Sequence, residues 1–191
     1  DRSLVALRNV VDRSVAEVRL ASGMASRLSV FSLADFIHEI KLAAMLEAHV
    51  RRCTVAVAPV DAHLAVDADH DLLASAVGNL LQNAFKFSHA GSEVELRAYA
   101  SGERILIEVE DGCGGLPPGF EERMFQPFAQ MGGDRTGLGL GLSIARRGVE
   151  ASGGKLKVRD VPGSGCVFTI DLPRREVVTA PREPQRTMAG H

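Results

Sequence analysis

The sequence predicts an α+β fold, an α/β sandwich in which a mixed, mostly antiparallel sheet packs on helices and a long amphipathic helix precedes the sheet. Three observations lead to this fold class. Helical patterns dominate the first half of the chain, paired strand patterns with tight turns follow, and a long glycine-rich segment separates two of these pairs. Hydrophobic residues make up 46% of the 191 residues, which is sufficient for one well-packed core.

The first helix is expected over residues 1–22, on a segment that is otherwise charged. Its apolar side chains recur at helical spacing: Leu4, Leu7, Val11, Val15 and Val18. Such a stripe needs a partner that covers it, so we expect residues 1–27 to lie outside the main domain.

Two further helices are expected over residues 33–50 and 69–87. Ser32 stands before the first of them and Asp69 opens the second, and both side chains are suited to cap a helix N-terminus.

The remaining elements follow from alternation and from turn residues. Strands are expected over residues 54–59, 62–67, 92–100, 104–110, 155–160 and 166–173. Tight turns after residues 100 and 160 make hairpins of the last four strands, and a short helix is expected over 142–150. Residues 174–191 are polar, contain two prolines and show no periodicity, which predicts a disordered tail.

The stretch "GLGLGL" at residues 137–142 places a glycine at every second position, immediately before an expected helix. A Walker A loop would need a lysine after the last glycine, and a dinucleotide-binding turn would need a strand before the first, so both motifs are excluded. Glycines let a backbone approach a ligand closely, and a helix N-terminus attracts anions. The stretch therefore favours a phosphate site, with a surface loop that binds nothing as the alternative.

A polar stripe runs along the expected helix 69–87. Asn79, Gln82, Asn83 and Lys86 are spaced so that they share one face of this helix. A solvated face is the simpler explanation, but two asparagines weaken a helix and add no charge. Amide oxygens suit Mg²⁺ and the lysine suits phosphate oxygens, so the stripe is a candidate binding face.

Asp111 ends the strand "RILIEVE" and leads into "DGCGGLPPG". A carboxylate at a strand end, followed by glycines, can accept a hydrogen bond from an amino group of a ligand. An ordinary Asp-Gly turn is the alternative.

Five motifs, taken together and in this order, resemble those of the ATP-binding domain of sensor histidine kinases, which has the GHKL or Bergerat fold shared with gyrase, Hsp90 and MutL. "NLLQNAFKF" resembles the N box, "DGCGG" the first glycine box, "MFQPF" the F box, "GLGLGL" the second glycine box and "GSGCVFTIDLP" the closing strand. The resemblance covers residues 30–173 and implies that residues 1–27 are the remnant of a dimerisation and phosphotransfer helix.

The resemblance also implies roles for single residues. Asn83 would hold the Mg²⁺ that bridges the ATP phosphates, with Asn79 nearby, and Lys86 would contact a phosphate. Asp111 would accept from the adenine amino group, and Gly115 would let the backbone pass close to the base.

Further contacts to the nucleotide would come from Phe87, which could cover a face of the purine, and from a lid formed by residues 116–140. Packing of Phe125 and Phe128 would anchor this lid. The lid and the residue after it would supply the remaining nucleotide-binding positions: Arg135, Thr136, Gly137, Leu138, Gly139, Leu140 and Gly141.

The implied activity is transfer of the γ-phosphoryl group of ATP to a histidine, and then to the receiver domain of a response regulator, in a cytoplasmic kinase that is a homodimer through its N-terminal region. His38 in "HEIKLAA" lacks the proline expected after an acceptor histidine, so we expect His38 to be structural and the acceptor to lie upstream. Two alternatives are a non-catalytic ATP-binding regulator and an anti-sigma serine kinase of the same fold.

Cys113 stands where the family's first glycine box usually has a glycine, so it would border the nucleotide. A small buried filler is the alternative role for this thiol. Three scattered cysteines argue against a disulfide scaffold or a zinc site and favour a reducing compartment. The net charge of -2, without a long basic run, argues against a nucleic-acid partner, and no apolar stretch is long enough to span a membrane.

Overall fold

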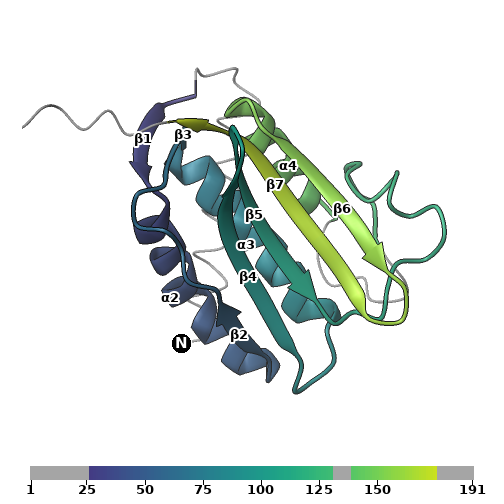
Figure 1. The fold of residues 1–191 in the computed structure, drawn as a ribbon. Coiled ribbons are helices and arrows are strands. Elements are labelled where there is room, and N and C mark those ends of the chain that lie inside the picture. The colour runs from purple at the N-terminus through teal and green to yellow at the C-terminus, as the bar shows by residue number, and fades with distance from the viewer. Residues whose placement is uncertain (1–25, 131–138, 176–191) are drawn as a thin grey trace, which may run out of the picture.

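The computed structural model describes residues 26–130 and 139–175, which form one seven-stranded sheet and three helices (Figure 1). The strands are β1 (Leu28–Ser32), β2 (Thr54–Val57), β3 (Ala65–Asp69), β4 (Glu93–Ser101), β5 (Arg104–Asp111), β6 (Lys155–Val161) and β7 (Gly165–Arg175). The helices are α2 (Leu33–Arg51), α3 (His70–Phe87) and α4 (Gly141–Ala151).

The strands follow the spatial order β1-β3-β7-β5-β4-β2, and β6 also pairs with β7. Only β2 and β4 pair in parallel, and the other pairs are antiparallel. The last strand of the described chain therefore lies in the middle of the sheet. The predicted class, a mixed and mostly antiparallel sheet with helices, is confirmed.

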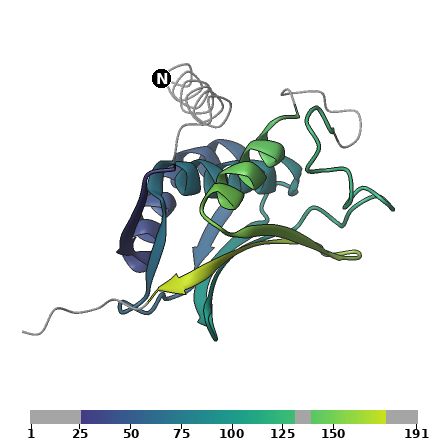
Figure 2. The same cartoon turned by 90° about the horizontal axis from the view of Figure 1, so that it is seen from above.

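The helices lie on one face of the sheet, as the view from above shows (Figure 2). Strand β5 shows why, because its residues alternate strictly between the two faces. Ile105, Ile107 and Val109 are fully buried against the helices, while the residues between them are only half-buried. On α3 the complementary apolar side, which includes Leu73 and Leu80, is also fully buried.

The opposite face of the sheet carries charged side chains. The guanidinium of Arg97 lies 3.3 Å from a carboxylate oxygen of Glu95, 3.4 Å from one of Glu108 and 2.6 Å from one of Glu110. Burial alone would raise the pKa of Asp171 on β7, but its hydrogen bonds from Arg104 and Lys157 hold that pKa below the usual value. Paired charges keep this face solvated.

Both predicted helix caps are present. Ser32 Oγ accepts from the backbone N–H of Asp35 at 3.2 Å and begins α2. Asp69 Oδ1 accepts from Leu72 N–H at 3.2 Å and begins α3. The second carboxylate oxygen of Asp69 accepts from Arg27 N–H at 2.9 Å, so this buried side chain also holds the segment before β1.

Several element bounds differ from the sequence-based expectation. Strand β1 was not expected, because it is a short strand at the edge of the sheet whose apolar residues are largely exposed. Strand β3 begins three residues later than predicted, and β7 runs to Arg175, two residues beyond its predicted end at 173. The predicted helix over 1–22 and residues 176–191 of the predicted tail lie outside the described residues.

Within the described ranges, none of the helices has the length and apolar character needed to cross a membrane.

Candidate functional site

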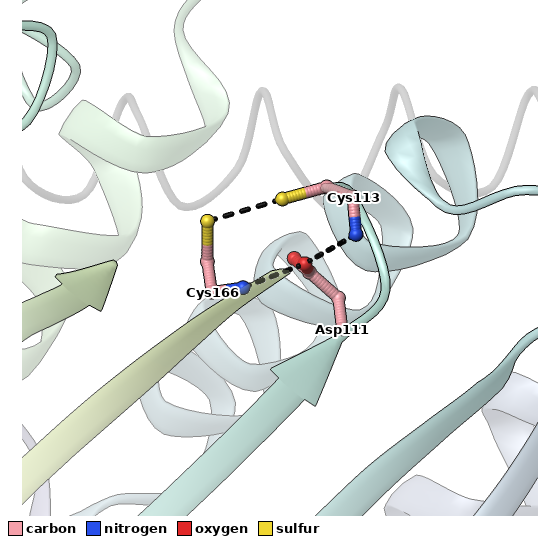
Figure 3. Close-up of side chains that lie close together, drawn as sticks. All are labelled: Asp111, Cys113 and Cys166. Carbon is pink, nitrogen blue, oxygen red and sulfur yellow. Dashed lines mark hydrogen bonds between the residues drawn. The ribbon is translucent and has the colours of Figure 1, made fainter. Parts of the chain in front are cut away.

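Asp111 is the last residue of β5 and is only 7% exposed (Figure 3). Its Oδ1 atom accepts two backbone hydrogen bonds, from the N–H of Cys113 and from the N–H of Cys166, each at 3.1 Å. Cys113 follows the end of β5, whereas Cys166 lies directly opposite Asp111 on β7. The carboxylate is thus held by two segments far apart in the sequence.

Gly165 allows this close arrangement. A Cβ atom at this position would collide with the backbone carbonyl of Asp111, so any side chain would force β5 and β7 apart. The residue is buried and begins β7. Neither Gly165 nor Cys166 was expected to have a role here, because the strand register that brings them to Asp111 cannot be read from the sequence.

Burial is the main reason that the pKa of the Asp111 carboxyl is raised above its ordinary value of 3.8. Hydrogen bonds from Cys113 and from the backbone of Cys166 oppose this shift. Burial also raises the pKa of the Cys113 thiol and that of the Cys166 thiol, and the Asp111 carboxylate adds to both shifts.

The polar stripe on α3 lies at different depths along the helix. Asn79 is only 5% exposed, and its Nδ2 donates to the carbonyl of Ser75 at 2.9 Å, which orients the amide. Asn83 and Lys86 are half-buried. The Lys86 ammonium lies 5.0 Å from the centre of the Phe87 ring, so these two neighbours pack on each other.

Direct contacts join the end of α3 to the loop after Asp111. The backbone N–H of Gly112 donates to Ser88 Oγ at 3.2 Å, and Ser88 is the residue that ends α3. His89 Nδ1 lies 3.3 Å from the carbonyl oxygen of Gly112. The segment that carries Lys86 is therefore held beside the strand end that carries Asp111. Ser88 had not been expected to contribute.

The glycines after Asp111 hold the loop against the β6–β7 turn. Gly114 donates to the carbonyl of Ser164 at 3.2 Å, and Gly163 donates to the carbonyl of Gly114 at the same distance. Gly115 has φ +105, and a Cβ atom there would lie 3.1 Å from a carboxylate oxygen of Asp160. Both conditions favour glycine at position 115.

The predicted lid is described up to residue 130 and again from Gly139. Gly139 has φ +67, and its carbonyl accepts from the N–H of Phe128 at 3.0 Å, so the two ends of the segment meet. Leu140 is half-buried, and Gly141 is the first residue of α4. The predicted binding residues Arg135, Thr136, Gly137 and Leu138 lie outside the described residues.

The two aromatic residues of this segment behave differently. Phe125 packs against the core, and the guanidinium of Arg146 lies 5.9 Å from the centre of its ring. Phe128 is 72% exposed and has φ +65, so the expectation that it anchors the segment by packing is wrong. His38, expected to be structural, is exposed on α2.

One protein-family model matches residues 68–176 of the chain. Its description is "Histidine kinase-, DNA gyrase B-, and HSP90-like ATPase". The match begins at the end of β3 and includes α3, Asp111 and the whole of β7.

Curated proteins similar to the chain include bacterial sensor proteins. The chain is 40% identical to the alginate biosynthesis sensor protein KinB of Pseudomonas aeruginosa over 97 residues, which are 51% of the chain. It is 44% identical to the sensor protein TorS of Escherichia coli strain K12 over 105 residues, which are 55% of the chain. The matched stretches span 16% of KinB and 11% of TorS, so the chain corresponds to a small part of these relatives.

Solved structures show the same fold. The full-length ShkA crystal structure in complex with AMPPNP matches 92% of the chain with a TM-score of 0.74 and 28% identity, and 37% of the ShkA chain is covered. The nucleotide-free catalytic domain of the histidine kinase ThkA matches 78% of the chain, with 96% of that domain covered, at a TM-score of 0.69 and 23% identity.

Proposed function

Because this chain belongs to the family of histidine kinase-, DNA gyrase B- and HSP90-like ATPases, we propose that it is the ATP–Mg²⁺-binding catalytic domain of a two-component sensor histidine kinase. It transfers the γ-phosphoryl group of ATP to a histidine, from which the group passes to the receiver domain of a response regulator. The observation that carries the proposal is the buried Asp111 carboxylate, held beside the end of the amide-bearing helix α3.

In this proposal, Asp111 recognises the adenine base of ATP. Its Oδ1 is already engaged by two backbone N–H groups, so Oδ2 is the oxygen that accepts from the adenine amino group. A carboxylate fixed in this way does not need to reorganise when the ligand arrives, which favours affinity. Gly115 lets the backbone lie close to the base, and Phe87 covers one face of the purine.

Asn83 holds Mg²⁺ and Lys86 contacts a phosphate oxygen in the same proposal. Both lie on the half-buried side of α3, one turn apart, and an amide oxygen and an ammonium are the groups that suit the metal and the phosphate respectively. When bound, Mg²⁺ neutralises charge on the phosphates. The residues of the chain therefore fit the cofactor by their chemistry.

Asn79 explains why the proposed reaction is transfer and not hydrolysis. Its amide is buried and cannot accept a proton, so it cannot serve as a general base for an attacking water. A docked histidine brings its own nucleophilic nitrogen and does not need this base. The residues proposed to contact the triphosphate are Arg135, Thr136, Gly137, Leu138, Gly139, Leu140 and Gly141.

ATP binding is tested by calorimetry with Mg²⁺ present. Asp111→Asn should weaken ATP binding by about 1–3 kcal/mol, which is roughly tenfold or more, because a buried acceptor is replaced by an amide. Glu110→Gln is the matched control: it removes the same charge from the neighbouring residue, which points to the other face of β5. Equal affinities of the wild type and Asp111→Asn would refute the assignment.

A second variant tests the assignment of Asn83 as the magnesium ligand. Asn83→Ala should abolish the Mg²⁺ dependence of ATP binding while thermal unfolding stays unchanged, and an unaltered dependence on Mg²⁺ would count against this ligand. Gln82→Ala, which removes a neighbouring half-buried amide from the same helix, is the control.

A non-catalytic ATP-binding regulator is the second candidate, and it shares every binding residue with the kinase. The two are distinguished by mixing the protein with a histidine-bearing dimerisation domain and [γ-³²P]ATP. A kinase produces acid-labile phosphohistidine on that domain, whereas a regulator binds ATP and leaves the histidine unmodified. The sensor proteins among the relatives favour the kinase. In this proposal the parent protein is cytoplasmic and is a homodimer through its N-terminal region.

A further inference from the structure

Two thiols and a carboxylate meet beside the proposed adenine position (Figure 3). One ligand atom from each of Asp111, Cys113 and Cys166 lies within 4.8 Å of the others, and the two sulfurs are 3.1 Å apart. The three residues come from the end of β5, the glycine loop and the start of β7. The third cysteine of the chain, Cys53, is buried elsewhere, next to the end of α2.

The backbone already holds these three residues in place. Asp111 Oδ1 accepts from the N–H groups of both cysteines, so each sulfur is attached to a fixed main-chain position. The loop that carries Cys113 is in turn held to the β6–β7 turn by the hydrogen bonds of Gly114. The donor atoms of these three residues are therefore in place before a ligand binds at the sulfurs.

The donor set indicates the class of ligand. Two cysteine sulfurs with one carboxylate suit a borderline-soft divalent cation such as Zn²⁺, whereas Mg²⁺ prefers oxygen donors alone. Three protein ligands leave the fourth position of a tetrahedral zinc site to water. Zn–S bonds of about 2.3 Å place two sulfurs about 3.8 Å apart, so the pair must open by less than ~1 Å. Cys113 is half-buried and lies in a loop, so its side chain can make that movement.

We propose that Asp111, Cys113 and Cys166 form a binding site for a thiophilic divalent cation of the Zn²⁺ class, and that the bound cation excludes adenine. The competition rests on the proposed function, because it requires the same Asp111 carboxylate to read the base. Cys166 is 1% exposed, so the cation enters past the half-buried Cys113. Each thiol releases a proton as its sulfur becomes a ligand.

The metal site is tested with Co²⁺ as the probe, in the presence of a phosphine reductant that keeps the thiols reduced. The wild type should bind one equivalent of Co²⁺, with a sulfur-to-cobalt charge-transfer band that Zn²⁺ removes. Cys113→Ala and Cys166→Ala should each lose most of this band, whereas Cys53→Ala should keep it. Thermal unfolding of each variant confirms that the fold is retained.

Three results would overturn the metal site. One is the absence of stoichiometric cobalt binding by the wild type, and another is a charge-transfer band that survives in both Cys113→Ala and Cys166→Ala. The third is a Cys113–Cys166 disulfide, seen as a mass lower by two hydrogens, that persists under the reductant and blocks cobalt binding. Such a disulfide would mean that the sulfurs had given two protons and two electrons to an oxidant.

The competition is tested with adenosine, which lacks the phosphates that would themselves chelate zinc. At a zinc concentration of ten times its Kd, competition raises the apparent adenosine Kd of the wild type about tenfold. The same zinc should leave the adenosine Kd of Cys166→Ala unchanged. An unchanged adenosine Kd in the wild type would overturn the competition. If adenosine does not bind the zinc-free protein, the proposed function fails, whereas the cobalt band still decides the metal site.

Discussion

At the level of single residues, the Asp111 carboxyl is buried and yet engaged by two backbone N–H groups. Burial favours its neutral form, and the hydrogen bonds favour its charged form. The net effect is a raised pKa, so the folded protein keeps this proton to a higher pH than the unfolded chain does. Ionisation of Asp111 therefore lowers stability as pH rises from 3.8 through the raised pKa.

The same shift predicts a pH dependence of base recognition. The adenine amino group needs an unprotonated acceptor, so adenosine affinity of the wild type should fall as pH drops through the raised pKa of Asp111. Asp111→Asn should show no such loss. Calorimetric titrations between about pH 7 and about pH 4 give the adenosine Kd of the wild type and that of Asp111→Asn. Protonation of adenosine affects both Kd values equally, so it cancels in their ratio. A ratio that does not change with pH would contradict the role of Asp111.

A second prediction about a single residue concerns the effect of Gly165 on stability. Gly165→Ala should lower the free energy of unfolding by about 2–3 kcal/mol, because its methyl group would collide with the backbone carbonyl of Asp111. Gly163→Ala, in the same turn, has φ +79 but open space around the new Cβ, so it should cost only about 1 kcal/mol. Urea denaturation measures both variants. A smaller loss for Gly165→Ala than for Gly163→Ala would show that the two strands can separate without cost.

At the level of elements, α3 and α4 should respond to different extents to the same glycine-to-alanine substitution. No atom lies within 4 Å of a Cβ built at Gly78 on α3, so Gly78→Ala should stabilise the protein by about 1 kcal/mol through helix propensity alone. A Cβ at Gly148 on α4 would lie 3.3 Å from the carbonyl oxygen of Leu72, where the two helices touch. Gly148→Ala should therefore stabilise the protein less than Gly78→Ala does, because this crowding offsets the same gain in helix propensity.

Thermal unfolding distinguishes these two helix variants. A gain in unfolding temperature for Gly148→Ala as large as that for Gly78→Ala would mean that the contact between α3 and α4 is loose. ATP affinity measured on Gly78→Ala should equal that of the wild type, because the substitution does not remove any of the polar side chains of α3.

The elements that could be predicted from the sequence are those whose signals are local. The caps at Ser32 and Asp69, the alternation along β5 and the turn at Gly102 each depend on neighbours in the chain, and each is confirmed. Strand β1 could not be predicted, because an exposed edge strand lacks the apolar alternation of a half-buried one.

The residues of the candidate site also differ in whether a local pattern predicts them. Asp111 and Gly115 stand in a recognisable motif, whereas Cys166 and Gly165 reach the site only through the pairing of β5 with β7. Asp111 and Cys166 are 55 residues apart in the chain, and pairing over such a separation depends on the whole sheet, so no local pattern reveals it. The pairing of Cys113 with Cys166 was missed for this reason.

At the level of the whole molecule, the position of β7 makes the sheet dependent on its last strand. Strand β7 separates β3 from β5 and is also the partner of β6, so removing it leaves two pieces of sheet and an unpaired β6. A chain that ends after Ser164 should therefore fail to fold, as seen by the loss of cooperative thermal unfolding. A chain that ends after Arg175 retains every described strand and is the matched control. Cooperative unfolding of the shorter chain would show that β7 is dispensable.

The central position of β7 also has a consequence for synthesis. While the chain emerges from the ribosome, β3 and β5 both present unpaired edges until β7 has left the exit tunnel. During synthesis, two sheet fragments with unpaired, aggregation-prone edges are therefore present together for a long interval. Cells that slow translation late in this domain, or that lack holding chaperones, are the ones in which aggregation of this protein should be greatest.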